Sequence, residues 1–493
     1  MMFFDVFKSY AFKLSFVCLL FSCLCAASSV DTSLSLSPEE VAYIQKRDSI
    51  TQAKILNIVQ DVFPSGFDKN TNKLPRVAFC FSGGGIRALI TSLGFMQGMQ
   101  TCGLVDCASY CAVLSGSSWF YTSLMLKNMD LENYREFIKS RIAQPFNKSV
   151  YAFWNELGAV SKQRGYSSIS DGYGKSVYKY LLGDTVSEDA SFDDIRKAIV
   201  SGAFNLPFPL CTAIVKSGYP YTWMEVNPFL SGSDELGGYV KTANWGSCFE
   251  KGTCTKELPE FSLASFMGIW GSAYCINRSD FERCGGAESL KSQPFYYYLE
   301  QTLGRVVSTE NLLYSAMNQI ESRSMFENPL FGMGLTTSEN KRVVVADAGL
   351  DFNLPTPPLF KKERGVDMIF ICDASAYTDE STEQDQFKSM TAHARRNGLN
   401  IPDLENPIKI TNDVFVFEDK DPSVPTIVYF KLFTTCGTLK FDYTNAEFDA
   451  VCDNAKNIVT SFQSGIDLAI KKKTMLLNQR RSWFKKLLSY LSV

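Results

Sequence analysis

Histidine is almost absent from this chain of 493 residues, which contains only His393. Sites that need two histidines are therefore excluded, among them the H-E-x-x-H zinc hydrolases and the two-histidine iron sites. A Ser-His-Asp triad would have this one residue as its base. The polar, helical stretch around His393 predicts a side chain that faces solvent rather than a catalytic base.

The net charge is also small, and long apolar runs are missing. The formal net charge of −3 argues against a nucleic-acid partner, and 45% hydrophobic with 20% charged residues excludes a largely disordered chain. The longest apolar run, 14–24, is shorter than the roughly 20 residues of a spanning helix. No transmembrane helix is predicted.

The apolar run has the features of a secretory signal peptide. Lys8 and Lys13 precede it, and small residues follow it at 25–27. We expect residues 1–27 to be removed and the chain to be secreted, or kept in a secretory lumen or cell envelope. A signal anchor or a lipid-modified Cys23 are the alternatives.

Cysteine spacing is consistent with export. Twelve of the 15 cysteines follow the predicted signal peptide, and the close pairs Cys248/Cys254 and Cys275/Cys284 predict disulfides. A zinc site is disfavoured because these spacings exceed the usual two to four residues. Triplets at Asn147 and Asn277 fit N-glycan acceptors.

Short apolar strands alternate with helices along the chain. We expect strands at 76–81, 110–114, 342–346 and 367–372, and helices at 38–61, 86–100 and 119–126. This order predicts an α/β fold of three layers, with a mostly parallel central sheet covered by helices on both faces. The Gly-, Pro- and aromatic-rich region of about 190–340 is expected to be a cap or insertion within one catalytic domain, 28–470.

Ser115 lies where a strand turns sharply into a helix. Such a turn lifts a serine out of the sheet as a nucleophile, and the helix N-terminus behind it stabilises negative charge. The usual pattern is G-x-S-x-G, and here Val113 and Ser117 replace the outer glycines. An ordinary helix-capping turn is the alternative.

Three glycines, 83–85, form a second strand-to-helix turn. Free N–H groups there suit an oxyanion, and Arg87 supplies a cation suited to a phosphate ester. The segment also matches G-x-G-x-x-A with Asp106 downstream, which leaves a dinucleotide site as a weaker alternative.

Asp347 follows the third predicted strand and could accept a proton directly from a serine. Partial burial would help it act as a base. With an ordinary pKa near 4 it would stay active below about pH 6.5, where an imidazole base is protonated. Capping of the next turn is the alternative role.

Five segments together carry a resemblance to a known family. They are 81–88, 114–119, 266–273, 347–355 and 364–367. In their order, over about 75–435, the chain resembles the catalytic domain of the cytosolic (group IV) phospholipases A2 and the fungal lysophospholipases B, related in mechanism to patatin.

The resemblance implies a phospholipase A2 or lysophospholipase that works through a serine-acyl intermediate. Ser115 would be the nucleophile and Asp347 its base, while the N–H groups of Gly84 and Gly85 would bind the oxyanion. Arg87 would hold the lipid phosphate or support its loop, and Arg364 matches a further basic residue of the site. No metal or cofactor is implied, and the partner would be a phospholipid surface or lysophospholipid micelles. Transacylation, or lipid binding without turnover, are the alternatives.

The C-terminal segment 471–493 is basic and amphipathic. It carries seven cations and no acid: Lys471, Lys472, Lys473, Arg480, Arg481, Lys485 and Lys486. Interleaved apolar residues allow it to lie on an anionic lipid surface. A helix packed on the domain is an equal alternative.

Overall fold

The computed structural model describes residues 29–146, 151–275, 324–335, 337–375, 380–432, 436–438 and 440–491. The predicted signal peptide, both predicted glycan acceptors and Cys284 lie outside these residues. No helix among those described is long and apolar enough to cross a membrane.

Five parallel strands form the centre of a 12-stranded sheet. In spatial order they are β14 (Thr426–Lys431), β11 (Met368–Asp373), β1 (Val77–Phe81), β2 (Ala108–Leu114) and β3 (Phe208–Lys216). β1, β2 and β11 are buried along their whole length. Strands covered on both faces are apolar at successive positions, which is why these segments were recognisable in the sequence.

Antiparallel strands extend both edges of this centre. On one side lie β13 (Val414–Phe417) and β12 (Ile408–Lys409), and on the other β4 (Thr222–Val226), β5 (Leu230–Ser233) and β6 (Gly238–Lys241). A separate hairpin pairs β7 (Cys248–Glu250) with β8 (Thr253–Lys256). The region of about 190–340 is therefore more than the expected cap, because β3 to β6 belong to the main sheet.

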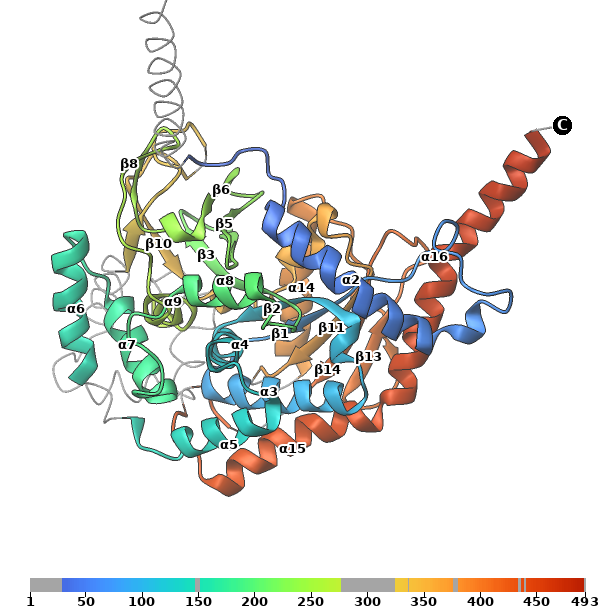
Figure 1. The fold of residues 1–493 in the computed structure, drawn as a ribbon, viewed down its shortest axis with the longest axis horizontal. Coiled ribbons are helices and arrows are strands. Elements are labelled where there is room, and N and C mark those ends of the chain that lie inside the picture. Colours follow the sequence, from blue (N-terminus) through green and yellow to red (C-terminus); the bar gives the residue numbers. More distant parts are fainter. Residues whose placement is uncertain are drawn as a thin grey trace, which may run out of the picture.

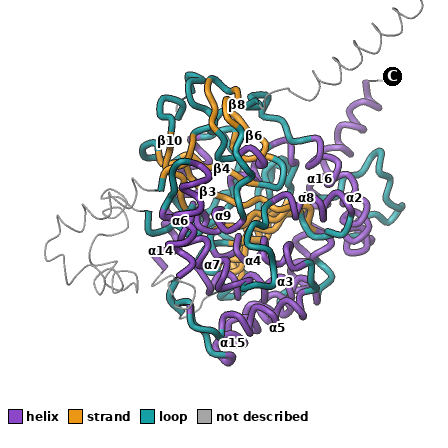
Figure 2. Tube along the Cα trace, turned by 60° about the vertical axis from the view of Figure 1, so that its left-hand side comes forward, coloured by secondary structure: helices purple, strands orange, loops and turns teal. Residues whose placement is uncertain are grey.

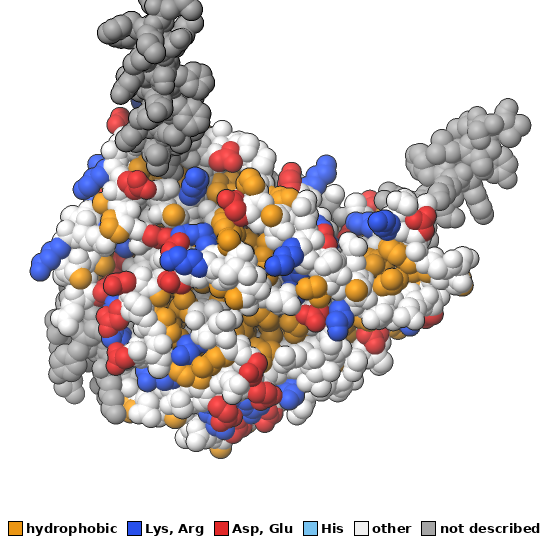
Figure 3. Space-filling view, viewed as in Figure 1, with side chains coloured by type: hydrophobic (Ala, Val, Ile, Leu, Met, Phe, Trp, Pro, Cys, Tyr) orange, Lys and Arg blue, Asp and Glu red, His pale blue; other side chains and the backbone are white. Residues whose placement is uncertain are grey.

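Helices cover both faces of the sheet, as predicted. They are α2 (Pro38–Ile58), α3 (Gly85–Thr101), α4 (Gly116–Lys127), α5 (Leu131–Ile142), α6 (Tyr151–Arg164), α7 (Ile169–Leu182), α8 (Phe192–Ser201), α9 (Leu263–Trp270), α14 (Glu380–Arg396), α15 (Asn445–Ser461) and α16 (Gln463–Leu491). Figure 1 shows α3, α5 and α15 together along one side of the central strands, with α2 across the other. Acidic and basic side chains are intermixed on the surface in Figure 3, in keeping with the small net charge.

A short strand, β10 (Arg342–Ala346), meets β2 end to end. β2 runs parallel to β3 and ends with Leu114 opposite Thr212, whereas β10 runs antiparallel and ends with Ala346 opposite Ile214. Both lie on the same edge of β3, because β4 occupies its other edge. The residues that follow the two strands, Ser115 and Asp347, therefore converge opposite Ala213.

The predicted disulfide Cys248–Cys254 is not formed, and both thiols are free. In the β7–β8 hairpin Cys248 faces Lys256, whereas Cys254 faces Phe249. The two cysteines are thus offset along the ladder, and side chains alternate between its faces. Cys275 instead donates to Ser324 Oγ at 2.9 Å.

The start of the basic C-terminal segment packs on the domain. Lys473 is buried and donates to the carbonyl oxygens of Pro422 (3.1 Å) and Val424 (2.6 Å). Lys471 pairs with Asp61 at 2.9 Å. The expected boundary at 470 is therefore not a structural one, although Figure 2 shows the far end of α16 projecting from the body.

Helix α3 approaches α15 closely at Gly94. A Cβ at this position would lie 2.0 Å from the carbonyl oxygen of Cys452, so the two backbones could not keep their spacing. We expect Gly94→Ala to lower the free energy of unfolding by about 1–3 kcal/mol, as overpacking does. Urea denaturation would measure it.

Gly158 in α6 is the matched control, because a Cβ there meets nothing within 4 Å. Gly158→Ala should raise the free energy of unfolding by about 0.5–1 kcal/mol through helix propensity. Equal effects of the two alanines would contradict the close approach of α3 and α15.

Candidate active site

Ser115 occupies a strained turn between β2 and α4. Its backbone has φ 52° and ψ −121°, a conformation that residues with a side chain rarely adopt. Gly116 allows the turn, since a Cβ there would lie 1.8 Å from the Gly85 carbonyl oxygen. The predicted elbow is thus present despite Val113, and it presses against the glycine loop.

The glycine loop places two backbone N–H groups beside Ser115. Gly84 (φ 140°) caps α3 and Gly85 begins it, so neither N–H has a partner within the helix. Both residues line the same cavity as Ser115. The arrangement provides hydrogen-bond donors where an oxyanion would form on a molecule attacked by the serine.

Asp347 is 2% exposed and lies directly after β10. Its Oδ1 accepts from the Gly349 N–H at 2.9 Å, and its own N–H donates to Ser272 Oγ at 3.2 Å. Burial raises the pKa of this carboxyl to about 7, although hydrogen bonds from Gly349 and Ser115 act in the opposite direction. Near neutral pH the group can therefore both lose and accept a proton.

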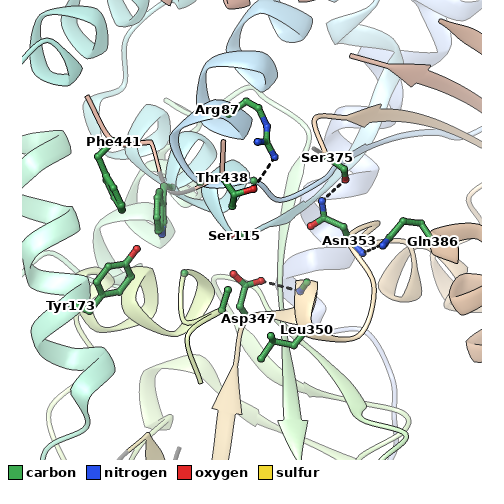
Figure 4. Close-up of a pocket in the computed structure, with 16 residues that line it drawn as sticks. Arg87, Ser115, Tyr173, Asp347, Leu350, Asn353, Ser375, Gln386, Thr438 and Phe441 are labelled. Atoms are coloured by element: carbon green, nitrogen blue, oxygen red, sulfur yellow. Dashed lines mark hydrogen bonds between the residues drawn. The ribbon is translucent and has the colours of Figure 1, made fainter. Parts of the chain in front are cut away.

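A cavity of about 270 Å³ opens above this pair (Figure 4). Its lining includes the largely apolar side chains of Trp119, Tyr173, Leu350 and Phe441, and polar but uncharged side chains from Asn353, Ser375, Gln386 and Thr438. Only Arg87 and Asp347 carry charge among the described lining residues. The cavity thus combines a nucleophile, a base and oxyanion donors with room for an apolar chain.

Asn353 joins the glycine loop to the Asp347 loop, a role that the sequence analysis missed. The Gly83 N–H donates to its Oδ1 and its Nδ2 donates to the Gly83 carbonyl, both at 3.1 Å. Its Nδ2 also donates to Ser375, and its N–H to Gln386 Oε1 at 2.6 Å. Asn353 lies in one of the recognised segments, but its contacts cross 270 residues of sequence and leave no local signal.

Arg87 lines the cavity, but its guanidinium is committed to the protein. Nε donates to the Ala374 carbonyl (2.7 Å), Nη1 to the Cys436 carbonyl (2.5 Å) and Nη2 to Thr438 Oγ1 (3.1 Å). The side chain is 1% exposed. Of the two roles expected for Arg87, these contacts favour support of the glycine loop over binding of a phosphate.

Arg364 is not brought to the cavity. It is buried between Glu40 of α2 and Glu225 of β4, with Nε 2.9 Å from Glu40 Oε1 and Nη2 2.5 Å from Glu225 Oε1. Its Nη1 also donates to the Pro358 carbonyl at 2.8 Å. The predicted site role is therefore not supported: Arg364 ties α2 to the sheet.

The prediction that His393 faces solvent is wrong. His393 is 2% exposed, and its Nε2 lies 3.0 Å from Glu235 Oε1. It packs against the rings of Phe352 and of Trp223 in β4, with ring centroids 5.5 and 6.0 Å away. It is not among the residues that line the cavity with Ser115.

The position of Asp106 excludes the alternative of a dinucleotide site. Asp106 lies just before β2 and pairs with Lys54 at 3.9 Å. The glycine loop follows the carboxyl end of β1, which is parallel to β2, so Asp106 lies at the opposite, amino-terminal end of these strands. A ribose-binding acid would have to follow the second strand.

Among the described residues, no three His, Cys, Asp or Glu side chains gather as metal ligands.

Comparison with known proteins identifies a matching family and several similar proteins. The family described as the lysophospholipase catalytic domain matches residues 77–405. Mouse cytosolic phospholipase A2 epsilon is 24% identical over 477 residues, which cover 82% of this chain and 52% of that protein. Mouse cytosolic phospholipase A2 gamma is 29% identical over 259 residues, covering 50% of this chain and 40% of that protein. The chain spans about half the length of these curated relatives.

Solved structures share the fold. Human GIVD cytosolic phospholipase A2 superposes with a TM-score of 0.74 at 18% identity, covering 92% of this chain and 69% of that one. The same human protein with methyl gamma-linolenyl fluorophosphonate superposes with a TM-score of 0.68 at 19% identity, over 92% and 67%. The predicted α/β fold is confirmed.

The predicted export is wrong by the same comparison, because the curated relatives are cytosolic phospholipases A2. The prediction had relied partly on cysteine pairs as disulfides. The thiols of Cys248 and Cys254 are free, so that support is lost as well.

The raised pKa of Asp347 makes stability depend on pH. Between the ordinary value of 3.8 and about 7, the folded protein holds a proton that the unfolded chain has released. The free energy of unfolding should therefore fall as the pH rises through this range. Asp347→Asn removes this titrating group. The free energy of unfolding of the variant, relative to that of the wild type, should therefore increase from pH 4 to pH 8, by about 1.4 kcal/mol per unit of pKa shift.

Urea denaturation at several pH values would measure this, with Asp184→Asn as the control. The Asp184 side chain is 96% exposed and keeps its hydration on folding. Parallel curves for the wild type and Asp347→Asn across this range would contradict a buried, proton-holding carboxyl.

Proposed function

This chain belongs to the family of the lysophospholipase catalytic domain, and we propose that it hydrolyses fatty-acyl esters of phospholipids and lysophospholipids through a Ser115–Asp347 dyad. The substrate is a lipid presented at a phospholipid surface or in lysophospholipid micelles. We assign the activity to the predicted domain 28–470 together with the packed first turns of α16.

The reaction begins with attack of Ser115 Oγ on the ester carbonyl as Asp347 takes its proton. The carbonyl oxygen becomes an oxyanion that accepts hydrogen bonds from the N–H groups of Gly84 and Gly85. The carbon–oxygen ester bond then breaks, and the leaving oxygen takes the proton from Asp347. Water attacks the acyl-serine by the same route, so the fatty acid leaves and Ser115 recovers its proton.

The observation that carries this proposal is the convergence of Ser115 and Asp347 at the meeting point of β2 and β10. A serine hydroxyl attacks slowly unless a base takes its proton. Asp347 hydrogen-bonds with Ser115, and burial raises its pKa to about 7, close to what a base at neutral pH needs. His393 is held by Glu235 away from the cavity and has no part in the step.

Labelling with a fluorophosphonate probe tests the nucleophile. We expect the probe to label the wild type at Ser115 and to leave Ser115→Ala unlabelled, with loss of hydrolysis but not of folding. Asp347→Asn should be nearly as inactive, since an amide cannot accept the proton. His393→Ala should keep its mechanism and most of its activity if it stays folded. A folded but inactive His393→Ala would overturn the dyad, and an unlabelled wild type would indicate a lipid-binding protein without turnover.

The titration of Asp347 also sets how the rate of hydrolysis depends on pH. Hydrolysis of a neutral ester should rise with pH through about 7 as Asp347 loses its proton. The expectation that activity persists below about pH 6.5 is revised, because burial raises the pKa of Asp347 to about 7. A rate that stays constant from pH 5 to pH 8 would contradict this role of Asp347.

Arg87 offers a second test, of its role in the loop. Its donors hold Ala374, Cys436 and Thr438, so Arg87→Ala should lower hydrolysis of a lysophospholipid and of a neutral p-nitrophenyl ester by similar factors. Lys127→Ala is a control for the loss of a cation outside the cavity. A much larger loss on the lysophospholipid alone would restore the phosphate-binding role.

A further inference from the structure

Tyr173 of α7 lines the same cavity as Ser115 and Asp347. Figure 4 shows its hydroxyl pointing into the cavity toward the side where Asp347 and Ser115 lie. No step of the mechanism above uses it. The Tyr173 side chain is half-buried. Its ring packs in the protein while its hydroxyl faces the cavity, which suggests a role for the hydroxyl.

The ring of Tyr173 is held in place by its neighbours. It packs edge-on against Tyr274, with ring centroids 5.1 Å apart, and against Trp119 at 6.4 Å. Trp119 is itself fixed by a 2.9 Å hydrogen bond from Nε1 to the Met267 carbonyl. Gly271 makes room for this packing, since a Cβ there would lie 2.3 Å from the Trp119 ring. The phenol is therefore aimed by rigid contacts.

The Tyr173 hydroxyl also differs from other buried phenols of the molecule. Tyr121, Tyr178 and Tyr180 each donate a hydrogen bond to a carbonyl oxygen, at 2.6 to 2.9 Å. Within the part of the chain that the structure describes, no hydrogen bond of the Tyr173 hydroxyl is seen. Its donor is available to a bound molecule.

We propose that Tyr173 is a third catalytic residue, whose hydroxyl donates a hydrogen bond to the leaving oxygen of the ester. The inference rests on the proposed function. In that reaction the leaving oxygen takes its proton from Asp347, so it must lie beside this carboxyl. The hydroxyl of Tyr173 points to the same side of the cavity, whereas the oxyanion lies against the glycine loop.

The proton balance is unchanged by this role. The Ser115–acyl bond forms, the ester carbon–oxygen bond breaks, and the serine proton passes through Asp347 to the leaving oxygen. Tyr173 lends a hydrogen bond to the alkoxide as charge builds on it and keeps its own proton. Burial and the nearby charge of Asp347 raise the pKa of the phenol, so it acts as a donor in its neutral form.

The leaving group provides the test. Tyr173→Phe removes only the hydroxyl and should lower kcat on a lysophosphatidylcholine about 10- to 100-fold with little change in KM, because the leaving glycerol alkoxide is strongly basic. On the p-nitrophenyl ester of the same acyl chain the loss should be within about threefold, since p-nitrophenolate leaves without help.

Tyr274→Phe is the matched control. It deletes the same atom from the neighbouring ring, but the Tyr274 hydroxyl lies 3.4 Å from Ser170 Oγ and does not line the cavity. This variant should match the wild type on both substrates. Equal losses of Tyr173→Phe on the two esters, or no loss on either, would overturn the inference.

Fluorophosphonate labelling separates this inference from the proposed function. Tyr173→Phe should label at the wild-type rate, because expulsion of fluoride does not depend on a protonated leaving oxygen. A large loss of labelling in Tyr173→Phe would show that the variant disturbs Ser115 and would overturn the leaving-group role. If the wild type neither labels nor hydrolyses either ester, the proposed function fails first, and the Tyr173 inference fails with it.

Discussion

The meeting of two strand ends on β3 is the constraint on which the site depends. β2 comes from the N-terminal part of the chain and β10 from a segment more than 200 residues later, yet both pair with the same edge of β3. Because they run in opposite directions, their carboxyl ends face each other. Ser115 and Asp347 therefore meet without either loop having to be long, and main-chain hydrogen bonds to β3 hold both loops in register.

Burial of the Asp347 carboxyl has two effects. It lowers the stability of the fold at neutral and alkaline pH, and it makes the carboxylate a better base. The end-to-end junction lies within the body of the protein, so Asp347 is almost fully shielded from water. The same shielding that raises its pKa to about 7 disfavours the folded state at alkaline pH. Neighbouring contacts compensate: Asn353 clamps the glycine loop, and Arg87 fastens that loop to Ala374 and Cys436.

The polar groups around the cavity therefore fall into two kinds. Some are committed to the protein, as Arg87 and Asn353 are, and they maintain the shape of the loops. Others face the cavity with donors still available, as Gly84, Gly85 and the hydroxyl of Tyr173 do. Residue type alone does not separate the two kinds: Arg87 had been a candidate phosphate ligand because arginine suits phosphate, and its contacts assign it to the protein instead.

Local sequence determined the parts of this protein that depend on neighbours along the chain. The apolar strands, the glycine turn after β1 and the elbow at Ser115 follow from short patterns, because burial on both faces and tight turns restrict which residues are tolerated. The scarcity of histidine likewise favoured a dyad. Tertiary structure alone decided the rest. Arg364 became a structural ion-pair residue because β4 brings Glu225 beside it, and His393 was buried because α14 brings it against Trp223 of β4 and Glu235. The raised pKa of Asp347, the clamp by Asn353 and the orientation of Tyr173 all arise from contacts between distant segments, and no local spacing encodes them.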